Sequence, residues 1–457
     1  MMSARRVCLV LVACACAVVG LAGCSSRPVC FCGPALPRPA HALDVTTAGR
    51  VRWQVPLARG GGSGNLSPLA VGAVAVFAQS DVLILRRAGA LVGSELYGLR
   101  LADGHRLWSR AFGQGIADMW RWQNLIIVLT QPGRNMRPLP VLTGLDASTG
   151  QTRWTLRVGE YAGGFSQTAD GGMAITVDRD GVSELEVVDL TSGRVRWTRP
   201  VDSDTDPPVP PVAVGGGAVL FAGTVGAANS SLTSYDDRTG QVRWTEALKP
   251  VIDTQALLQA SARLVYLTAE VPHAAGGQPT WVLLGISAAD GRVKWRVAPG
   301  QLESLDVYAP GLISVGTSLD GLDPATGRVR WQIASPDQAI ATPAGIIVTA
   351  PGPASGPAAG TYQIRVRHTL TGRTRWTAEL TEPLAVGPGQ TYEASPPPPV
   401  FLAGRLLVAP TAGPDGTELL AAFRISDGHR AWEVTLPGPV EAPVSAARGG
   451  LLVYAGG

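Results

Sequence analysis

Apolar residues in this chain gather in short runs, separated by stretches rich in glycine and proline. Five of these runs are LIIVLT (125–130), AVLFAG (218–223), RLVYLT (263–268), GIIVTA (345–350) and RLLVAP (405–410). Each run is too short for a typical helix, and most are rich in β-branched residues. The runs therefore predict buried strands. A second apolar stretch that follows, such as ELEVVDL (184–190), predicts a further strand in the same unit.

A polar turn with a tryptophan behind it recurs after these strands. The stretches DASTGQTRW, DLTSGRVRW, DDRTGQVRW and DPATGRVRW end at Trp154, Trp197, Trp244 and Trp331. Behind such turns the spacing Gly-x-x-x-Trp occurs nine times, ending at Trp53, Trp108, Trp154, Trp197, Trp244, Trp295, Trp331, Trp376 and Trp432. A period of about 45 residues with four short strands in each unit is typical of a propeller blade. We therefore predict an all-β fold, a β-propeller of four-stranded blades.

The chemistry of the turn explains its residues. Asp189 can accept backbone N–H groups within the bend, and Gly193 supplies the positive φ that the bend requires. In the strand that follows, strict alternation places Val195 and Trp197 on one face, and Arg194 and Arg196 on the other. We expect the indole to wedge between neighbouring blades, where its burial stabilises the ring.

The N-terminus has the order of residues that is typical of an exported protein. Arg5 and Arg6 precede an apolar run, and LAGC then ends at Cys24. The LAGC stretch resembles the bacterial lipobox, and this implies cleavage before Cys24 and a lipid on its thiol. We expect a signal peptide over 1–23, a flexible tether over 24–45 and the propeller over 46–457. A single membrane-spanning anchor is the alternative, and either places the body outside the cytoplasmic membrane.

The repeat L-D-x-x-T-G-x-x-x-W resembles that of the pyrroloquinoline-quinone-repeat, or quinoprotein-dehydrogenase-like, β-propeller family. This resemblance covers essentially the whole body and implies eight blades. The family includes quinoprotein alcohol and glucose dehydrogenases. It also includes the non-enzymatic propeller lipoprotein of the outer-membrane barrel-assembly machine. The chain resembles this lipoprotein in its lipobox, in its tether and in blades that carry no catalytic residues. Strict counting leaves strands over at 49–53 and 439–457. The strand at 49–53 is expected to close the ring beside C-terminal strands. Two explanations of the surplus stay open, one irregular unit or accessory strands at the two ends.

Cysteine usage and charge exclude several classes of function. All six cysteines lie within the first 32 residues, so the body has no disulfide, thiol nucleophile or thiolate metal site. The pair Cys30 and Cys32 has too short a spacing for an unstrained disulfide, and its role stays open. A net charge of +3 without a basic tract gives no reason to expect a nucleic-acid partner.

The resemblance implies the residues that a quinone-dependent enzyme would need, and the sequence lacks them. Such enzymes carry adjacent cysteines under the quinone, a calcium site of Glu, Asn and Asp, and a carboxylate base. No adjacent cysteine pair occurs here, and no convincing acid–Asn–acid set was found. The five histidines are scattered, with His105 and His429 inside the turns themselves. We therefore predict no enzyme, no catalytic residue, no metal site and no cofactor.

Two further features are candidates for binding. Acidic residues precede the expected inner strands and predict an acidic collar at one rim of the propeller. The alternative is that these residues are solvated loop charges. They are Asp202, Asp204, Asp206, Asp253, Glu303, Asp306, Asp337, Glu382 and Glu441. Trp120 and Trp122 form the one tryptophan pair outside the repeat, with core packing as the plainer reading. The arginines of the turns predict contact with anionic lipid or wall polymer, with covering of the tryptophans and blade edges by their stems as the alternative.

The function predicted from these features is a monomeric, lipid-anchored scaffold for protein interaction or assembly at the cell envelope. Its expected partners are the membrane, through the lipid at Cys24, and an unidentified envelope protein. Two alternatives stay open, a quinone-dependent dehydrogenase and an extracytoplasmic ligand sensor.

Overall fold

The computed structural model describes residues 40–456 apart from segments between strands. These segments are 47–48, 57–74, 78–81, 89–93, 132–138, 160, 180, 202–209, 226–228, 249–257, 262, 272–279, 299–301, 309–310, 317, 335–337, 343–344, 352–360, 382–400, 404, 414–416, 437–439 and 448–449. The expected signal peptide, Cys24 and most of the expected tether lie outside the described residues. No helix among the described residues is long and apolar enough to span a membrane.

Every regular element in the described part of the chain is a strand. Eight four-stranded antiparallel sheets follow one another along the chain. They are β3 (Ala75–Phe77), β4 (Val82–Ala88), β5 (Ser94–Arg100), β6 (Arg106–Phe112); β7 (Gly115–Trp122), β8 (Leu125–Gln131), β9 (Val141–Asp146), β10 (Thr152–Arg157); β11 (Tyr161–Gln167), β12 (Gly172–Arg179), β13 (Val182–Asp189), β14 (Val195–Pro200); β15 (Val212–Val214), β16 (Ala218–Val225), β17 (Asn229–Asp236), β18 (Val242–Leu248); β19 (Leu258–Ala260), β20 (Leu264–Val271), β21 (Thr280–Ser287), β22 (Val293–Val297); β23 (Leu302–Tyr308), β24 (Gly311–Gly316), β25 (Ser318–Leu322), β26 (Val329–Ala334); β27 (Gln338–Thr342), β28 (Gly345–Pro351), β29 (Thr361–Arg367), β30 (Thr374–Thr381); and β31 (Phe401–Ala403), β32 (Leu406–Ala412), β33 (Glu418–Arg424), β34 (Arg430–Thr435).

A ninth sheet joins the two ends of the described chain. It has the order β2-β1-β36-β35, with β1 (Ala40–Thr46), β2 (Val51–Pro56), β35 (Val440–Ala447) and β36 (Gly450–Gly456). The strands that an eight-bladed count leaves over therefore form a blade of their own. The described residues hold nine four-stranded sheets, one more than expected, and the first of their strands begins at Ala40, ahead of the expected boundary at residue 46.

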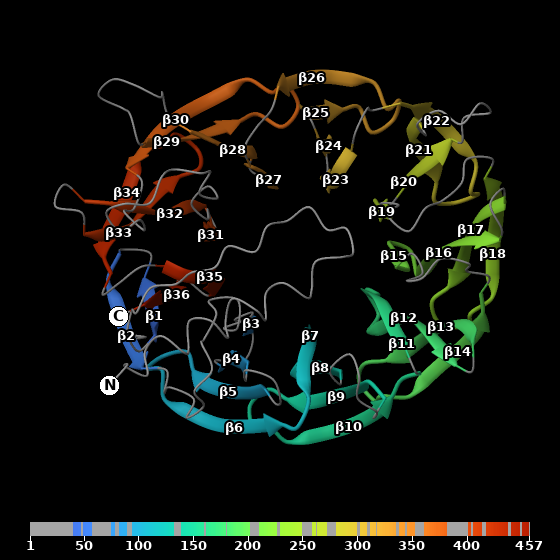
Figure 1. The fold of residues 1–457 in the computed structure, drawn as a ribbon, viewed down its shortest axis with the longest axis horizontal. Coiled ribbons are helices and arrows are strands. Elements are labelled where there is room, and N and C mark those ends of the chain that lie inside the picture. Colours follow the sequence, from blue (N-terminus) through green and yellow to red (C-terminus); the bar gives the residue numbers. More distant parts are fainter. Residues whose placement is uncertain are drawn as a thin grey trace, which may run out of the picture. The chain divides into compact units, whose positions relative to one another are not determined.

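The sheets follow one another around a ring (Figure 1). The first strands of successive sheets contact each other from β11 through β15, β19 and β23 to β27, and β35 contacts both β31 and β3. This arrangement confirms the all-β propeller with four-stranded blades.

The core lies in the seams between consecutive sheets. In one seam Ile127 and Leu142 pack with Met173 and Val188 of the next sheet, and all four are buried. The predicted run LIIVLT forms most of β8, which is buried along its middle. Both faces of each second strand meet a neighbouring sheet, so second strands such as β8, β12 and β32 are apolar along their middle, unlike the outermost ones.

Each outermost strand carries a β-bulge at the residue before its tryptophan. In β14, Val195 pairs with Val188 and Trp197 with Val187, so that Arg196 has no partner in the ladder. The expectation of strict alternation is wrong here, because the extra residue breaks the period of two. Val195 is 37% exposed, whereas Trp197 is 7% exposed. Such bulges protect edge strands from pairing with another chain.

The indole of each described repeat tryptophan reaches the next sheet. Trp197 donates its Nε1–H to the carbonyl of Asp237, 3.0 Å away, and its ring lies on Gly240. A Cβ on Gly240 would lie 2.7 Å from the ring, and the φ of this glycine is 66°. Seven tryptophans donate to the next sheet in this way, at 2.8–3.1 Å; they are Trp108, Trp154, Trp197, Trp244, Trp295, Trp331 and Trp376.

The eighth of these contacts, where the ring closes, differs from the others. Trp432 lies on Gly49, in the turn between β1 and β2 of the ninth sheet, but its buried Nε1–H has no hydrogen-bond partner among the described residues. We call this ninth sheet, built from both ends of the described chain, the composite sheet. The side chain of the ninth predicted tryptophan, Trp53, lies outside what the structure describes. A buried donor without a partner costs free energy that the other seams do not lose.

This difference predicts unequal effects of the same substitution. Trp376→Phe removes the 2.8 Å bond to the Ile425 carbonyl, whereas Trp432→Phe removes an unpaired donor. Both variants lose the same ring volume, so Trp376→Phe should lower the free energy of unfolding by about 1–2 kcal/mol more than Trp432→Phe. Urea denaturation of the two variants measures the difference, and equal losses would contradict it.

Candidate interaction surface

The repeated turns between third and fourth strands build one face of the propeller. In the turn after β13, the amide of Gly193 donates to the carbonyl of Asp189 at 2.8 Å. The Asp189 carboxylate accepts the amides of Thr191 and Ser192 at 3.1 and 2.9 Å. Gly193 has a φ of 69°, as the bend requires. The sequence pattern thus predicts the internal geometry of the turn correctly.

The arginine left unpaired by the bulge reaches back to the turn aspartate. This ion pair recurs in four sheets, at 2.7–2.8 Å, between Asp146 and Arg153, Asp189 and Arg196, Asp236 and Arg243, and Asp323 and Arg330. It joins the turn to the outermost strand. The sequence holds the signal as a recurring aspartate seven residues before an Arg-Trp pair, and the sequence-based reasoning missed it.

The ion pairs set the protonation of the aspartates. Burial by itself raises the pKa of Asp146, but hydrogen bonds from Ser148 and Arg153 outweigh this effect and hold the pKa at about 2. The hydrogen bond from Arg243 lowers the pKa of Asp236 even further. Both carboxylates are therefore ionised at neutral pH and act as fixed acceptors for their turns.

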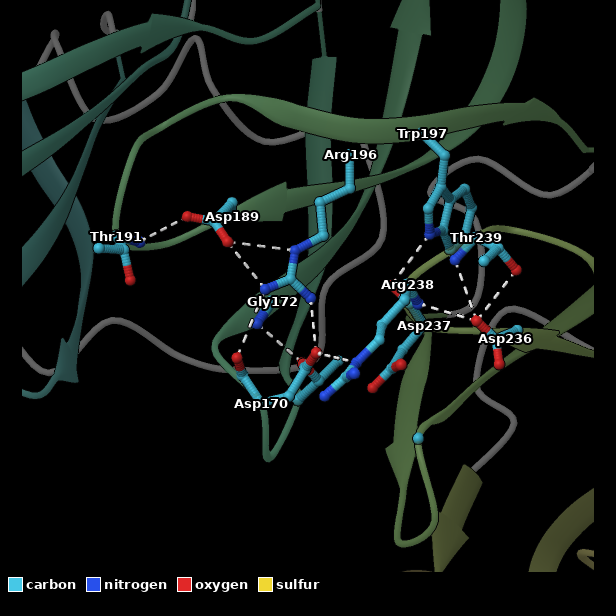
Figure 2. Close-up of polar contacts among 12 residues, drawn as sticks. Asp170, Gly172, Asp189, Thr191, Arg196, Trp197, Asp236, Asp237, Arg238 and Thr239 are labelled. Atoms are coloured by element: carbon cyan, nitrogen blue, oxygen red, sulfur yellow. Dashed lines mark hydrogen bonds and ion pairs between the residues drawn. The ribbon is translucent and has the colours of Figure 1, made fainter.

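At one seam these pairs extend into a network between two sheets (Figure 2). Arg196 lies between Asp189 and Asp170, with contacts of 2.8 and 2.9 Å. Arg238, in the turn of the next sheet, reaches the same carboxylate of Asp170 at 3.1 Å. Asp170 belongs to the turn between β11 and β12, so turns of both kinds meet on this face.

Burial and the surrounding charges shift the groups of this network in opposite directions. Burial lowers the pKa of Arg196, but the hydrogen bonds and charges of Asp189 and Asp170 raise it above its ordinary value. Burial, and then the carboxylates of Asp170 and Asp236, raise the pKa of Asp237, which is 3% exposed. The network is balanced within itself, so it offers little net charge to a partner.

One position of the turn face does point its side chains to solvent, and we name it the turn ring. It is the residue that follows each turn glycine, and its nine members are Arg50, His105, Gln151, Arg194, Gln241, Arg292, Arg328, Arg373 and His429. All nine are exposed. Among the described residues no carboxylate forms an ion pair with Arg194, Arg328 or Arg373. Arg292 and His429, by contrast, lie near Asp290 and Asp427, and Gln151 and Gln241 carry no charge. The positive charge that the turn ring offers to a partner therefore lies at Arg194, Arg328 and Arg373.

The other predicted candidates fall in three groups. Trp120 packs on Phe165 of the next sheet with ring centroids 4.7 Å apart, and Trp122 donates to Thr191 Oγ1 at 3.1 Å. Both contact a buried apolar cluster, which favours the plainer reading, core packing. Of the acidic collar, the residues Asp202, Asp204, Asp206, Asp253, Asp337 and Glu382 lie outside the described residues, and the side chains of Glu303, Asp306 and Glu441 are not described.

The remaining candidates concern metals, histidines and cysteines. In the described part of the chain, no group of three or more His, Cys, Asp or Glu residues is arranged to hold a metal ion. His105 and His429 are members of the turn ring, and His368 accepts the amide of Leu370 at 3.2 Å inside its own turn. Cys24, Cys30 and Cys32 lie outside the described residues.

Comparison with known proteins gives one family and a shared fold. The family model described as outer membrane protein assembly factor BamB matches residues 140–296 and 183–348. No curated protein matches the chain. The repeat and this family match make the chain a PQQ-repeat β-propeller that resembles BamB.

Solved structures are similar in fold at low sequence identity. BamB from Moraxella catarrhalis is 15% identical with a TM-score of 0.41, and the match covers 74% of this chain and 96% of that one. Quinohemoprotein alcohol dehydrogenase ADHIIG from Pseudomonas putida HK5 is 12% identical with a TM-score of 0.40, over 74% and 69%. A eukaryotic initiation factor is 10% identical with a TM-score of 0.53, over 92% and 98%. These similarities concern the fold alone.

The low pKa of Asp146 predicts how stability changes with pH. Its ordinary value is 3.8, so the pairing of Asp146 stabilises the protein above about pH 4 and is lost as the pH falls toward about 2. Asp146→Asn should lower the free energy of unfolding by about 2 kcal/mol at pH 6 and by much less at pH 2. Urea unfolding of wild type and variant across this range measures the gap. A gap that stays constant with pH would rule out the ionised pair as its source.

Proposed function

We propose that the protein is an exported, lipid-anchored, non-catalytic scaffold that binds an acidic protein of the cell envelope through its turn ring. The observation that carries the proposal is the contrast on the turn face. The aspartates and bulge arginines neutralise each other, whereas the turn ring leaves its arginines exposed. The family match to an assembly factor supports a binding role over a catalytic one.

The chemistry of the turn ring favours carboxylates as the partner groups. A guanidinium is planar, always charged and able to donate two parallel hydrogen bonds to one carboxylate. Arg328 and Arg373 stand at equivalent positions of neighbouring sheets, so one acidic surface can contact both. Exposed charges of this kind speed up association and select the partner.

Charge reversal tests this surface. Arg328→Glu with Arg373→Glu should reduce recovery of crosslinked envelope partners at least tenfold. Arg157→Glu with Arg296→Glu changes the charge equally at exposed positions on the far ends of two outermost strands and should leave recovery unchanged. Recovery is measured by quantitative mass spectrometry after crosslinking in intact cells. Equal recovery from both double variants would exclude the turn ring as the docking surface.

The chemistry of the partner can be tested at the same positions. Arg328→Lys with Arg373→Lys keeps the positive charge and supplies amines that a carbodiimide joins directly to carboxylates. Crosslinks from these lysines to Asp or Glu of a second protein are expected. Lysines at 328 and 373 that remain unmodified while the complex still forms would contradict an acidic partner.

The anchor is a separate part of the proposal. The basic, apolar and LAGC segments that end at Cys24 support a lipoprotein signal. Cys24→Ala should accumulate as an uncut precursor that takes up no lipid label, whereas Cys30→Ala should be cut and labelled like the wild type. Precursor mass and labelling in a bacterial host measure both. A Cys24→Ala protein of mature mass that partitions into detergent would disprove the anchor.

A further inference from the structure

One sheet differs from the other eight described sheets in the kind of residue at one position of its third strand. On the third strand of each sheet, the residue after the one that pairs with the tryptophan is apolar in eight cases, namely Val45, Leu99, Leu145, Val188, Tyr235, Ile286, Leu322 and Phe423. In β29 this position holds Arg367. A charged residue at a position that the repeat reserves for apolar packing requires a compensating interaction.

The apolar residues at this position pack against the tryptophan of the preceding sheet. The rings of Tyr235 and Trp197 lie 5.9 Å apart, and those of Phe423 and Trp376 lie 6.3 Å apart. By equivalence Arg367 belongs to the seam that Trp331 crosses. Its Nη1 donates to the carbonyl of Gly372 at 2.9 Å, and Gly372 is the glycine on which the Trp331 ring lies.

A second arginine enters the same seam. Arg365 lies two residues before Arg367, and so on the same face of β29, while Ile364 and Val366 are fully buried on the opposite face. Arg365 donates to Gln363 Oε1 at 2.7 Å. Both arginines are partly buried.

Neither arginine has an ion-pair partner among the described residues. The buried Nε of Arg367 has no hydrogen-bond partner there either. Burial, and then the charge of Arg365, lower the pKa of Arg367, whereas two carboxylates raise that of Arg196 in the network of Figure 2. Two like charges that are partly removed from water repel each other, and an anion between them would offset this repulsion.

We propose that Arg365 and Arg367 form a binding site for a small oxyanion in the seam between the β23–β26 and β27–β30 sheets. The free Nε–H of Arg367 and the remaining N–H groups of Arg365 supply planar, charged donors, and these match the paired oxygens of a phosphate, sulfate or carboxylate. The ligand would occupy the place that an apolar side chain fills in the other seams. This site is distinct from the turn ring, and its test does not depend on the proposed scaffold function.

Anion-dependent thermal unfolding of the full body tests the site. With ionic strength held constant by sodium chloride, inorganic phosphate should raise the melting temperature of the wild type progressively, because a ligand that binds only the folded state stabilises it. Sulfate and glutarate, assayed in the same way, distinguish tetrahedral oxyanions from carboxylates. A melting temperature that depends on ionic strength alone would overturn the proposal.

The repeat itself supplies a variant that should fold. Arg367→Leu restores the kind of residue that the other sheets carry, and should melt in chloride at or above the wild-type temperature. Its apparent affinity for phosphate should fall at least tenfold. Arg296→Gln removes an exposed arginine that lies outside both proposed sites and should keep the wild-type response. An undiminished response in Arg367→Leu would overturn the site, as would a melting temperature in chloride well below that of the wild type, since that loss indicates a carboxylate of the chain as the partner.

Discussion

The contact of an indole with a glycine of the next sheet is the interaction on which the ring depends. No described strand belongs to two blades, so side chains must hold neighbouring blades together. Each described repeat tryptophan crosses the seam with its ring, and seven also cross it with a hydrogen bond. The glycine that receives the ring also makes the turn, because its positive φ and its missing Cβ meet both needs. Turn and tryptophan therefore recur together.

The bulge on each outermost strand gives two residues that lie two positions apart different roles, one structural and one at the exposed surface. Arg196, which the bulge leaves out of the ladder, pairs with Asp189 and Asp170 and holds turns in place. Arg194, two residues earlier, lies exposed in the turn ring. The same residue type thus stabilises the blade at one position and is available to a partner at the other. The register of the strand decides which role each arginine has.

The sequence predicts what depends on local chemistry. The Asp and Gly of the turn, the tryptophan period and the apolar runs are enough to predict four-stranded blades, because eight of the nine described blades are built from consecutive strands. The ninth sheet was predicted only in part. The strand at 49–53 is expected to close the ring beside C-terminal strands, but β1 lies mostly within the expected tether, and its pairing with β36 spans almost the whole chain. The exposure of Val195 was missed because a bulge leaves no trace in the alternation. Arg367 stands out only when third strands are aligned by their pairing with tryptophan.

The composite sheet also determines when its strands can pair during synthesis. Ribosomal synthesis proceeds from β1 to β36, so β1 and β2 emerge first and β35 and β36 last. The eight consecutive sheets can form and pack against one another while β1 still lacks its neighbour β36. During that interval the free edge of β1 exposes unpaired backbone groups that can pair with a strand of another chain. Until the last strand has emerged, the sheet that holds β1 thus depends on isolation from other chains, as a chaperone can provide.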